Sequence, residues 1–277
     1  MVLGFWILAA VLTGDASPST RPTAASIMAR VAKNQDRSNQ IRADYIYRQR
    51  IHVASRKSNG KLMCEERRDY LVIPGADSTT KKLQVLSGRC WHKRRYVSFS
   101  KKLQGHDQSI DCSIVDSFAG DFTNEHSKDG IAKDLFPLTT EQQKKDEFKL
   151  IGVTTLDGRK VYRIGFRPKD KKDIAWAGEA DIDESEFQPV YVFTKLSRRL
   201  PFAVRTFLAA LPGLGFNVQY HRQADGVWFP TSFGTEFRIK ILMFYRRTYT
   251  ISLENSDFQR AHVTSNIRYA KPASPPK

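Results

Sequence analysis

The sequence predicts a mainly β protein built on an antiparallel sheet with helical cover. In the last third of the chain, apolar and polar side chains alternate over three successive segments, 216–221, 233–241 and 248–253. Alternation of this kind, with short loops between the segments, is typical of a meander with one apolar face and one wet face. The chain has 277 residues, of which 40% are hydrophobic, so it can form a sizeable core.

The apolar face of this meander is unusually aromatic, and we expect it to line an apolar cavity. Residues 197–211 precede it with apolar side chains at helical spacing, and the part from Pro201 to Leu211 is expected to form a short lid over the open end of the sheet. A filled core is the alternative, because sequence alone does not separate a full barrel from a hollow one. The candidate cavity residues are Phe216, Val218, Tyr220, Phe237 and Ile239 from the meander, with Phe207 and Leu211 from the preceding segment.

The first residues predict export. An apolar run from Val2 to Thr13 is too short to span a bilayer but suits the core of a signal peptide, with cleavage after Ala16. We therefore expect a periplasmic protein with a signal peptide at 1–16, a single domain at 17–270 and a disordered tail at 271–277.

The segments upstream of the meander extend the same pattern. A helix capped by Thr23 or Ser26 is expected to run to about Ile41. Short helical pieces are expected over 109–118 and 139–146, in a stretch where the alternation disappears. The expected strands are Tyr45–Val53, Leu62–Ile73, Leu83–Arg89 with a prolongation to Phe99, Phe148–Thr155, Val161–Pro168, Trp176–Asp183 and Pro189–Phe193.

The three cysteines lack metal-ligand spacing and, in an exported protein, favour one disulfide and one remaining thiol. A symmetric hairpin that sets Ile73 opposite Lys81 also sets Cys64 opposite Cys90. Cross-strand neighbours are close enough for a disulfide, so Cys64–Cys90 is the expected pair. A register slip of one residue would destroy this match.

The sequence contains no hydrolase, metalloprotease, phosphate-loop or dinucleotide motif, and we expect neither catalysis nor a cofactor. Glu179, Asp181 and Asp183 share one strand face, where they either hold a metal ion or, as we prefer, pair with basic residues. The six histidines are scattered and are expected at the surface. The net charge of +16 suits anionic partners, but no nucleic-acid motif accompanies it.

Several segments together resemble a known family. They are the opening helix over 25–39 with the strand start Asp44–Tyr47, the turn and strand Gly158–Lys169, the segment Trp176–Asp183 and the segment Asp225–Thr231. The order and character of these segments resemble the bacterial outer-membrane lipoprotein-sorting proteins of the LolA/LolB type, particularly a poorly characterised exported branch. The resemblance implies an incomplete antiparallel β-barrel wrapped around helices, with an apolar cavity for acyl chains.

The resemblance and the residues together predict a monomeric periplasmic carrier that binds a lipid or an acylated protein. The alternative is an envelope interaction module with a filled barrel, which docks on anionic membrane or cell-wall surfaces through its basic exterior. The long excursion between Arg89 and Phe148, the cysteines and the positive charge depart from the family pattern.

Overall fold

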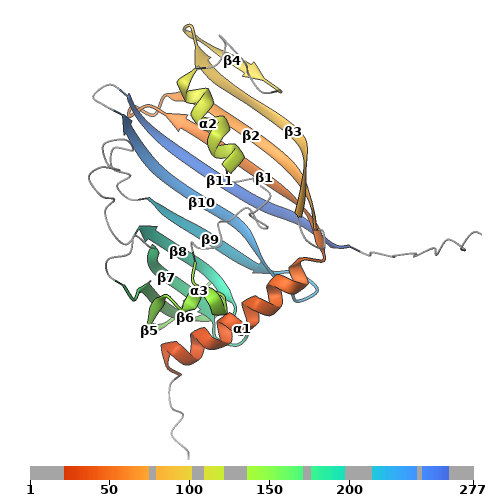
Figure 1. The fold of residues 1–277 in the computed structure, drawn as a ribbon, viewed down its shortest axis with the longest axis vertical. Helices are drawn as coiled ribbons and strands as arrows, with labels where there is room; N and C mark the ends of the chain where they lie inside the picture. Colours follow the sequence, from red (N-terminus) through yellow and green to blue (C-terminus); the bar gives the residue numbers. More distant parts are fainter. Residues whose placement is uncertain are drawn as a thin grey trace, which may run out of the picture.

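The computed structural model describes residues 22–74, 79–101, 109–121, 136–170, 176–196, 214–241 and 245–261, and these form one antiparallel sheet with helices against it (Figure 1). The helices are α1 (Ala24–Arg42), α2 (Ile110–Asp121) and α3 (Thr140–Gln143). The strands are β1 (Tyr45–Arg56), β2 (Leu62–Pro74), β3 (Thr79–His92), β4 (Arg95–Phe99), β5 (Asp146–Leu156), β6 (Arg159–Pro168), β7 (Trp176–Asp183), β8 (Pro189–Leu196), β9 (Gly215–Arg222), β10 (Trp228–Ile241) and β11 (Tyr245–Arg260).

The sheet has 11 strands in the order β4-β3-β2-β1-β11-β10-β9-β8-β7-β6-β5. Two meanders, β1 to β4 and β5 to β11, are therefore joined where the first strand pairs with the last along nearly their whole lengths. The outermost strands β4 and β5 do not pair with each other, so the sheet does not close. The predicted unclosed antiparallel sheet with helical cover is confirmed.

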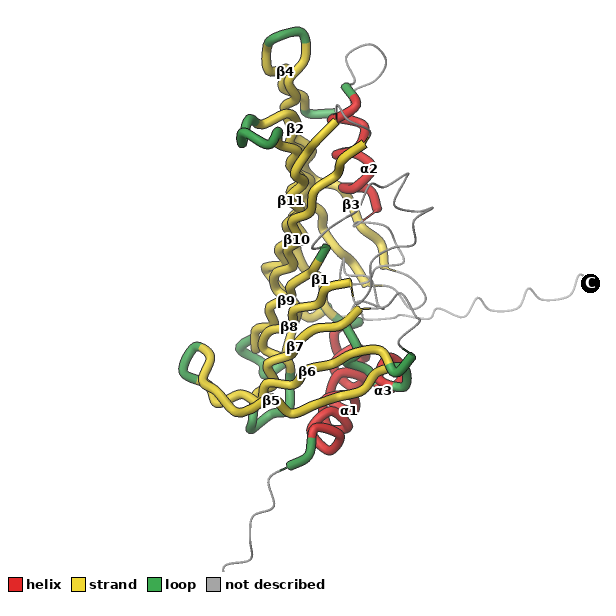
Figure 2. The backbone as a smooth tube through the Cα atoms, turned by 90° about the vertical axis from the view of Figure 1, so that its left-hand side faces the viewer, coloured by secondary structure: helices red, strands yellow, loops and turns green. Residues whose placement is uncertain are grey.

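All three helices lie on one face of the sheet, which we call the inner face (Figure 2). Helix α1 begins where the Thr23 side chain accepts a hydrogen bond from the Ser26 backbone N–H, as predicted. With α3 it covers the β5 end of the sheet, whereas α2 covers β1 and β2. The opposite, outer face has no helix among the described residues.

The inner face carries two hydrophobic clusters, one under each cover. The α1 cluster centres on Ile27 and Val31 of the helix packed against β6 to β10. The α2 cluster joins Val115 of its helix to β1, β2, β10 and β11. Leu214 packs against both clusters and so connects them.

Local differences from the predicted elements have identifiable causes. The strand expected to continue to Phe99 turns back at Lys93 and Arg94, and forms the separate strand β4. Pro230 stands inside β10 at a register irregularity, a position where a missing N–H is tolerated. The expected helix at 197–211 lies outside the described residues.

Candidate ligand-binding face

The candidate site is the inner face, where directly opposed side chains of neighbouring strands share one side of the sheet. The central row runs from Ile164 through Ala180, Val192, Val218, Phe233 and Leu253 to Ile51. All of these residues are buried. On β2 the residue opposite Ile51 is Arg68, so a charged side chain continues the row on an otherwise apolar face.

The structure places the predicted cavity residues in two groups. Phe216, Val218 and Tyr220 lie in the α1 cluster, whereas Phe237 and Ile239 lie in the α2 cluster. Each of the five is at most 7% exposed. Phe207 and Leu211 lie outside the described residues.

The aromatic members of this set make specific ring contacts. The Phe216 ring stacks on Phe233 with ring centroids 5.3 Å apart and meets Trp176 edge-on at 5.0 Å. The Phe237 ring meets Phe118 of α2 edge-on at 5.4 Å. The Phe118–Phe237 contact joins the α2 cover to the sheet, whereas the two Phe216 contacts join strands of the sheet to each other. Offset or edge-on pairs add to the energy of area burial.

An accessible apolar side chain on the inner face occurs in β3. A β-bulge leaves Gln84 unpaired, so that Leu83 lies opposite Tyr70 and Val85 opposite Asp69. Leu83 therefore shares the inner face with buried Tyr70, whereas Val85 lies with Asp69 beside an outer-face hollow of about 270 Å³. Both side chains are 46% exposed, although simple alternation would put them on one face.

Sequence reasoning missed a buried polar residue on this face. Gln49 is fully buried, and its Nε2 donates to the Asn255 side chain at 3.2 Å. Its Oε1 is buried and accepts no hydrogen bond within the described part of the chain. An unpaired acceptor of this kind is costly unless a ligand or water donates to it. The only sequence signal is a polar residue in phase with the apolar side chains of its strand.

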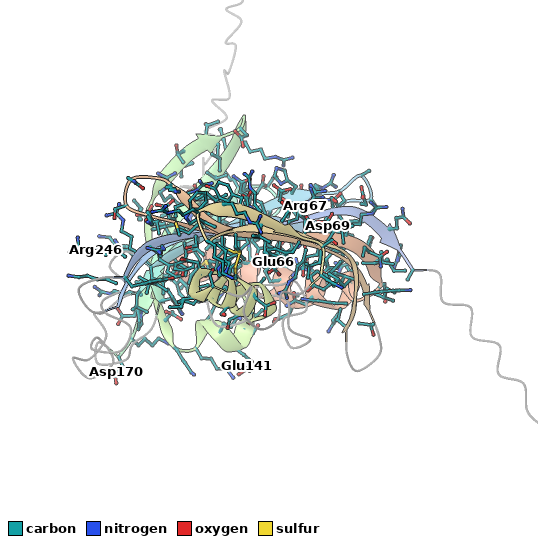
Figure 3. All side chains as sticks on the ribbon, turned by 90° about the horizontal axis from the view of Figure 1, so that it is seen from above. Glu66, Arg67, Asp69, Glu141, Asp170 and Arg246 are labelled. Atoms are coloured by element: carbon teal, nitrogen blue, oxygen red, sulfur yellow. A yellow bond between two sulfur atoms is a disulfide. The ribbon has the colours of Figure 1, made fainter. Side chains whose placement is uncertain are left out.

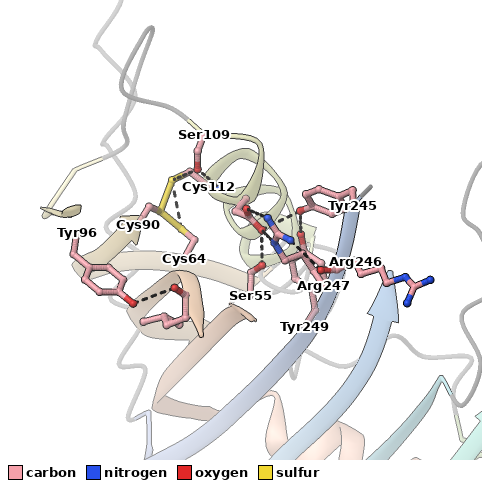
Figure 4. Close-up of polar contacts among 12 residues, drawn as sticks. Ser55, Cys64, Cys90, Tyr96, Ser109, Cys112, Tyr245, Arg246, Arg247 and Tyr249 are labelled. Carbon is pink, nitrogen blue, oxygen red and sulfur yellow. Dashed lines mark hydrogen bonds and ion pairs between the residues drawn. A yellow bond between two sulfur atoms is a disulfide. The ribbon is translucent and has the colours of Figure 1, made fainter. Parts of the chain in front are cut away.

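Helix α2 is fixed at its first turn by a buried polar network (Figure 4). The Asp111 carboxylate accepts hydrogen bonds from Ser55 Oγ at 2.6 Å, Tyr245 OH at 3.0 Å and Arg247 Nε at 2.8 Å. Burial raises the pKa of Tyr245 well above its usual range, and the hydrogen bond with Tyr249 adds to the shift. Burial alone would lower the pKa of Arg247, but the contacts with Asp111 outweigh it and raise that pKa.

A second buried ion pair holds the middle of α2. Arg68 is 4% exposed and contacts both Glu66 of its own strand and Asp116 of the helix. Figure 3 shows Glu66 on the α2 side of the sheet, with Arg67 and Asp69 on the opposite side. Replacing one partner of such a buried pair leaves an uncompensated charge.

Three buried cysteine sulfurs meet where α2 begins. Cys64 and Cys90 lie directly opposite each other on β2 and β3, with Cα atoms 4.0 Å apart. Cys90 Sγ also reaches Cys112 of α2, with a Cα separation of 6.3 Å, and Cys112 Sγ lies 3.5 Å from Cys64 Sγ. One sulfur forms a single disulfide bond, so these are alternative pairs, and Cys64–Cys90 stays a prediction.

The register that brings Cys64 opposite Cys90 differs in detail from the predicted one. Ile73 lies opposite Thr80 and not Lys81, a slip of one residue at the loop end of the hairpin. The bulge at Gln84 reverses this slip before the cysteines are reached.

The carboxylates of β7 pair with arginines of β6. Arg163 contacts Asp181 at 2.8 Å, and Arg159 contacts Asp183 at 3.4 Å. Burial alone would raise the pKa of Asp183, but hydrogen bonds from Ser185 and from the Glu186 backbone outweigh it and lower that pKa. This arrangement agrees with ion pairing rather than with the metal-ion alternative.

Among the described histidines, His221 is exposed, whereas His52 and His92 are partly exposed. His52 pairs with Glu65 and His221 with Thr231. The Nε2 atom of His92 is buried with no hydrogen-bond partner among the described residues, which the expected surface position did not predict. No helix of the described ranges is long and apolar enough to cross a membrane.

No protein-family model and no curated protein matches the chain. Among solved structures, a LolA superfamily protein from Nitrosomonas europaea is similar, with 11% identity, a TM-score of 0.36 and coverage of 88% of this chain and 96% of that one. A DUF1329 family protein from Desulfovibrio piger has 9% identity, a TM-score of 0.39 and the same two coverages.

A third similar structure is a Vibrio parahaemolyticus domain assigned as an outer membrane lipoprotein-sorting protein, with 10% identity and a TM-score of 0.33. Its alignment covers 84% of this chain and 92% of that domain. The structural neighbours thus include the proteins that the sequence resembles. At these TM-scores the likeness assigns no function to this chain.

Proposed function

We propose that this protein is a non-enzymatic carrier that binds a lipid or an acylated ligand on the inner face of its sheet. It acts as a monomeric periplasmic protein, with residues 17–270 as one domain. The observation that carries the proposal is the mostly apolar inner face, whose two hydrophobic clusters, one under each cover, meet at Leu214. An unclosed sheet gives an acyl chain access to that face from its edge.

Two further features of the inner face support this function. Leu83 presents accessible apolar surface at the β3 edge. Gln49 Oε1 offers a buried acceptor for a ligand hydroxyl or amide. A mostly apolar surface with few polar groups that fix orientation is typical of small-molecule sites.

The direct test is native mass spectrometry and solvent extraction of the purified full-length protein. We expect co-purified lipid, or stoichiometric binding of a fluorescent fatty acid to the delipidated protein. A protein that carries no lipid and binds no acyl probe would contradict the carrier function.

A matched pair of variants locates the ligand. Leu83→Gln and Val85→Gln remove equally exposed apolar side chains from one strand, but from opposite faces. We expect Leu83→Gln to weaken acyl-probe binding by roughly three- to tenfold, since a buried CH₂ contributes about 0.8 kcal/mol. Val85→Gln serves as the control and should leave binding unchanged. Equal effects would place the ligand elsewhere.

A further inference from the structure

One end of the sheet gathers basic side chains from three hairpins. Arg56 at the end of β1 pairs with both Leu62 and Thr248, and Thr248 in turn pairs with Arg238 of β10. The β1–β2, β3–β4 and β10–β11 connections therefore leave the sheet at this end. We call the following residues the basic end: Arg56, Lys57, Lys61, Lys93, Arg94, Arg95, Arg238, Lys240 and Arg246.

None of the nine forms an ion pair within the described part of the chain, and all but Lys61 are exposed. The described segments 56–61, 93–101, 238–241 and 245–248 contain no Asp or Glu. On the outer face, in contrast, arginines pair with carboxylates, as in Arg67–Asp69 at 2.6 Å and Arg89–Glu65 at 2.6 Å. The basic end is thus a positively charged patch whose described segments carry no neutralising carboxylate.

The tip of the β3–β4 hairpin places two cations in an unfavourable backbone conformation. His92 pairs with Arg95, and the two residues between them have positive φ, 46° for Lys93 and 68° for Arg94. A two-residue turn of this kind favours Asn-Gly, because left-handed conformations crowd a Cβ. Residues kept in such conformations cluster at functional positions.

Aromatic side chains stand beside this tip. Trp91 and Tyr96 meet edge-on with ring centroids 5.0 Å apart, and Tyr96 is 43% exposed. Lys61 Nζ lies 3.5 Å from the Trp91 ring centroid. Trp and Tyr prefer the headgroup level of a bilayer, and nearby Lys and Arg attract anionic lipids.

We propose that the basic end is a docking surface for an anionic lipid bilayer, with the Lys93-Arg94 tip and the Trp91–Tyr96 pair at the headgroups. The aromatic pair favours a bilayer over a nucleic acid or another soluble polyanion. Docking uses no residue of the inner-face site, so it is measured without an acyl ligand and stands apart from the carrier function.

The test is co-sedimentation of the full-length protein with phosphatidylcholine vesicles, with and without phosphatidylglycerol. We expect binding only when phosphatidylglycerol is present, and its loss when the salt is raised from about 0.1 M to about 1 M, where the screening length falls from ~10 Å to ~3 Å. Salt-insensitive binding, or equal binding to both kinds of vesicle, would overturn the proposal.

The decisive variant is Lys93→Asn combined with Arg94→Gly, which removes two charges while giving the turn its preferred residues. Its melting temperature should equal or exceed that of the wild type. Its vesicle affinity should fall roughly 10- to 30-fold, since a basic residue near an anionic surface contributes about fivefold. The control is Lys149→Gln with Lys160→Gln, which removes two exposed charges from the β5–β6 hairpin.

The outcomes separate a docking surface from a general charge effect. Retention of affinity in the control and loss in the turn variant support the proposal. Equal losses in both would show that net charge alone matters. Tighter binding to double-stranded DNA than to the anionic vesicles, weakened by the same turn variant, would assign the surface to nucleic acid and overturn the proposal.

Discussion

Asp111 offers the sharpest test of how the α2 cover is held. Its side chain is 7% exposed and accepts hydrogen bonds from three side chains on two strands, Ser55 of β1 and Tyr245 and Arg247 of β11. Asp111→Ala leaves the Arg247 guanidinium, 13% exposed, without its carboxylate. It also leaves the fully buried Ser55 hydroxyl without its acceptor.

Loss of one partner from a buried ion pair costs about 3–5 kcal/mol, and an unsatisfied hydroxyl costs about 1–3 kcal/mol. These terms belong to one network and do not add, so we expect a loss of about 3–5 kcal/mol in the free energy of unfolding. At about 2–4 °C per kcal/mol, the melting temperature should fall by roughly 10 °C.

Urea denaturation and amide exchange of Asp111→Ala check this prediction, with the loss of protection concentrated in α2. Asp44→Ala is the control, because its 3.8 Å pair with Arg260 is solvent-exposed on both sides and should contribute less than about 1 kcal/mol. A loss below about 1 kcal/mol in Asp111→Ala, with unchanged exchange in α2, would refute the assigned role of the network.

Three further outcomes are expected. Burial raises the pKa of Asp146 from 3.8 to about 6, so its protonated form favours folding at low pH and that contribution is lost as pH rises through about 6. Asp146→Asn should therefore stabilise the protein by about 1 kcal/mol at neutral pH, and no gain should remain near pH 4 in thermal melts. Gly178→Ala should lower the free energy of unfolding in urea by more than about 3 kcal/mol, because its Cβ would lie 1.9 Å from a β8 carbonyl oxygen. Gly152→Ala is the control, since its Cβ would meet no atom within 4 Å, and it should cost under about 1 kcal/mol. Similar costs for the two variants would contradict the close approach of β7 and β8. Cys112→Ala should retain the Cys64–Cys90 disulfide, and Cys64→Ala should retain the Cys90–Cys112 disulfide. Peptide mapping without reductant checks both variants, and the absence of both disulfides would refute the alternative pairing.

The sheet was predictable from sequence because apolar and polar side chains alternate along most of its strands. The burial of Phe216, Val218 and Tyr220 follows directly from that period. The same rule fails at Leu83 and Val85, where a bulge moves residues two apart to opposite faces. Strand β3 pairs with β4 only over Gly88–His92, so residues 83–85 have one strand neighbour, and the bulge there leaves no distinct mark in the sequence.

The α2 anchor was beyond sequence reasoning for a different reason. Asp111 and Arg247 are 136 positions apart, and each belongs to an ordinary polar-looking segment. Only the fold shows that both side chains are largely buried between α2 and the sheet, where an acid and a base must find partners. The cysteine register was predicted correctly although its assumed loop register was not, because the slip and the bulge cancel.

The pairing of β1 with β11 has a consequence for how the chain folds. Strand β1 lies inside the sheet and is synthesised well before β11, so one of its two edges stays uncovered until β11 pairs with it. Pairing of such distant segments is slow, because a long loop must close before any contact rewards it. We therefore expect β1 to β4 and β5 to β10 to pair early as separate units, and β11 to join them in the step that completes the core.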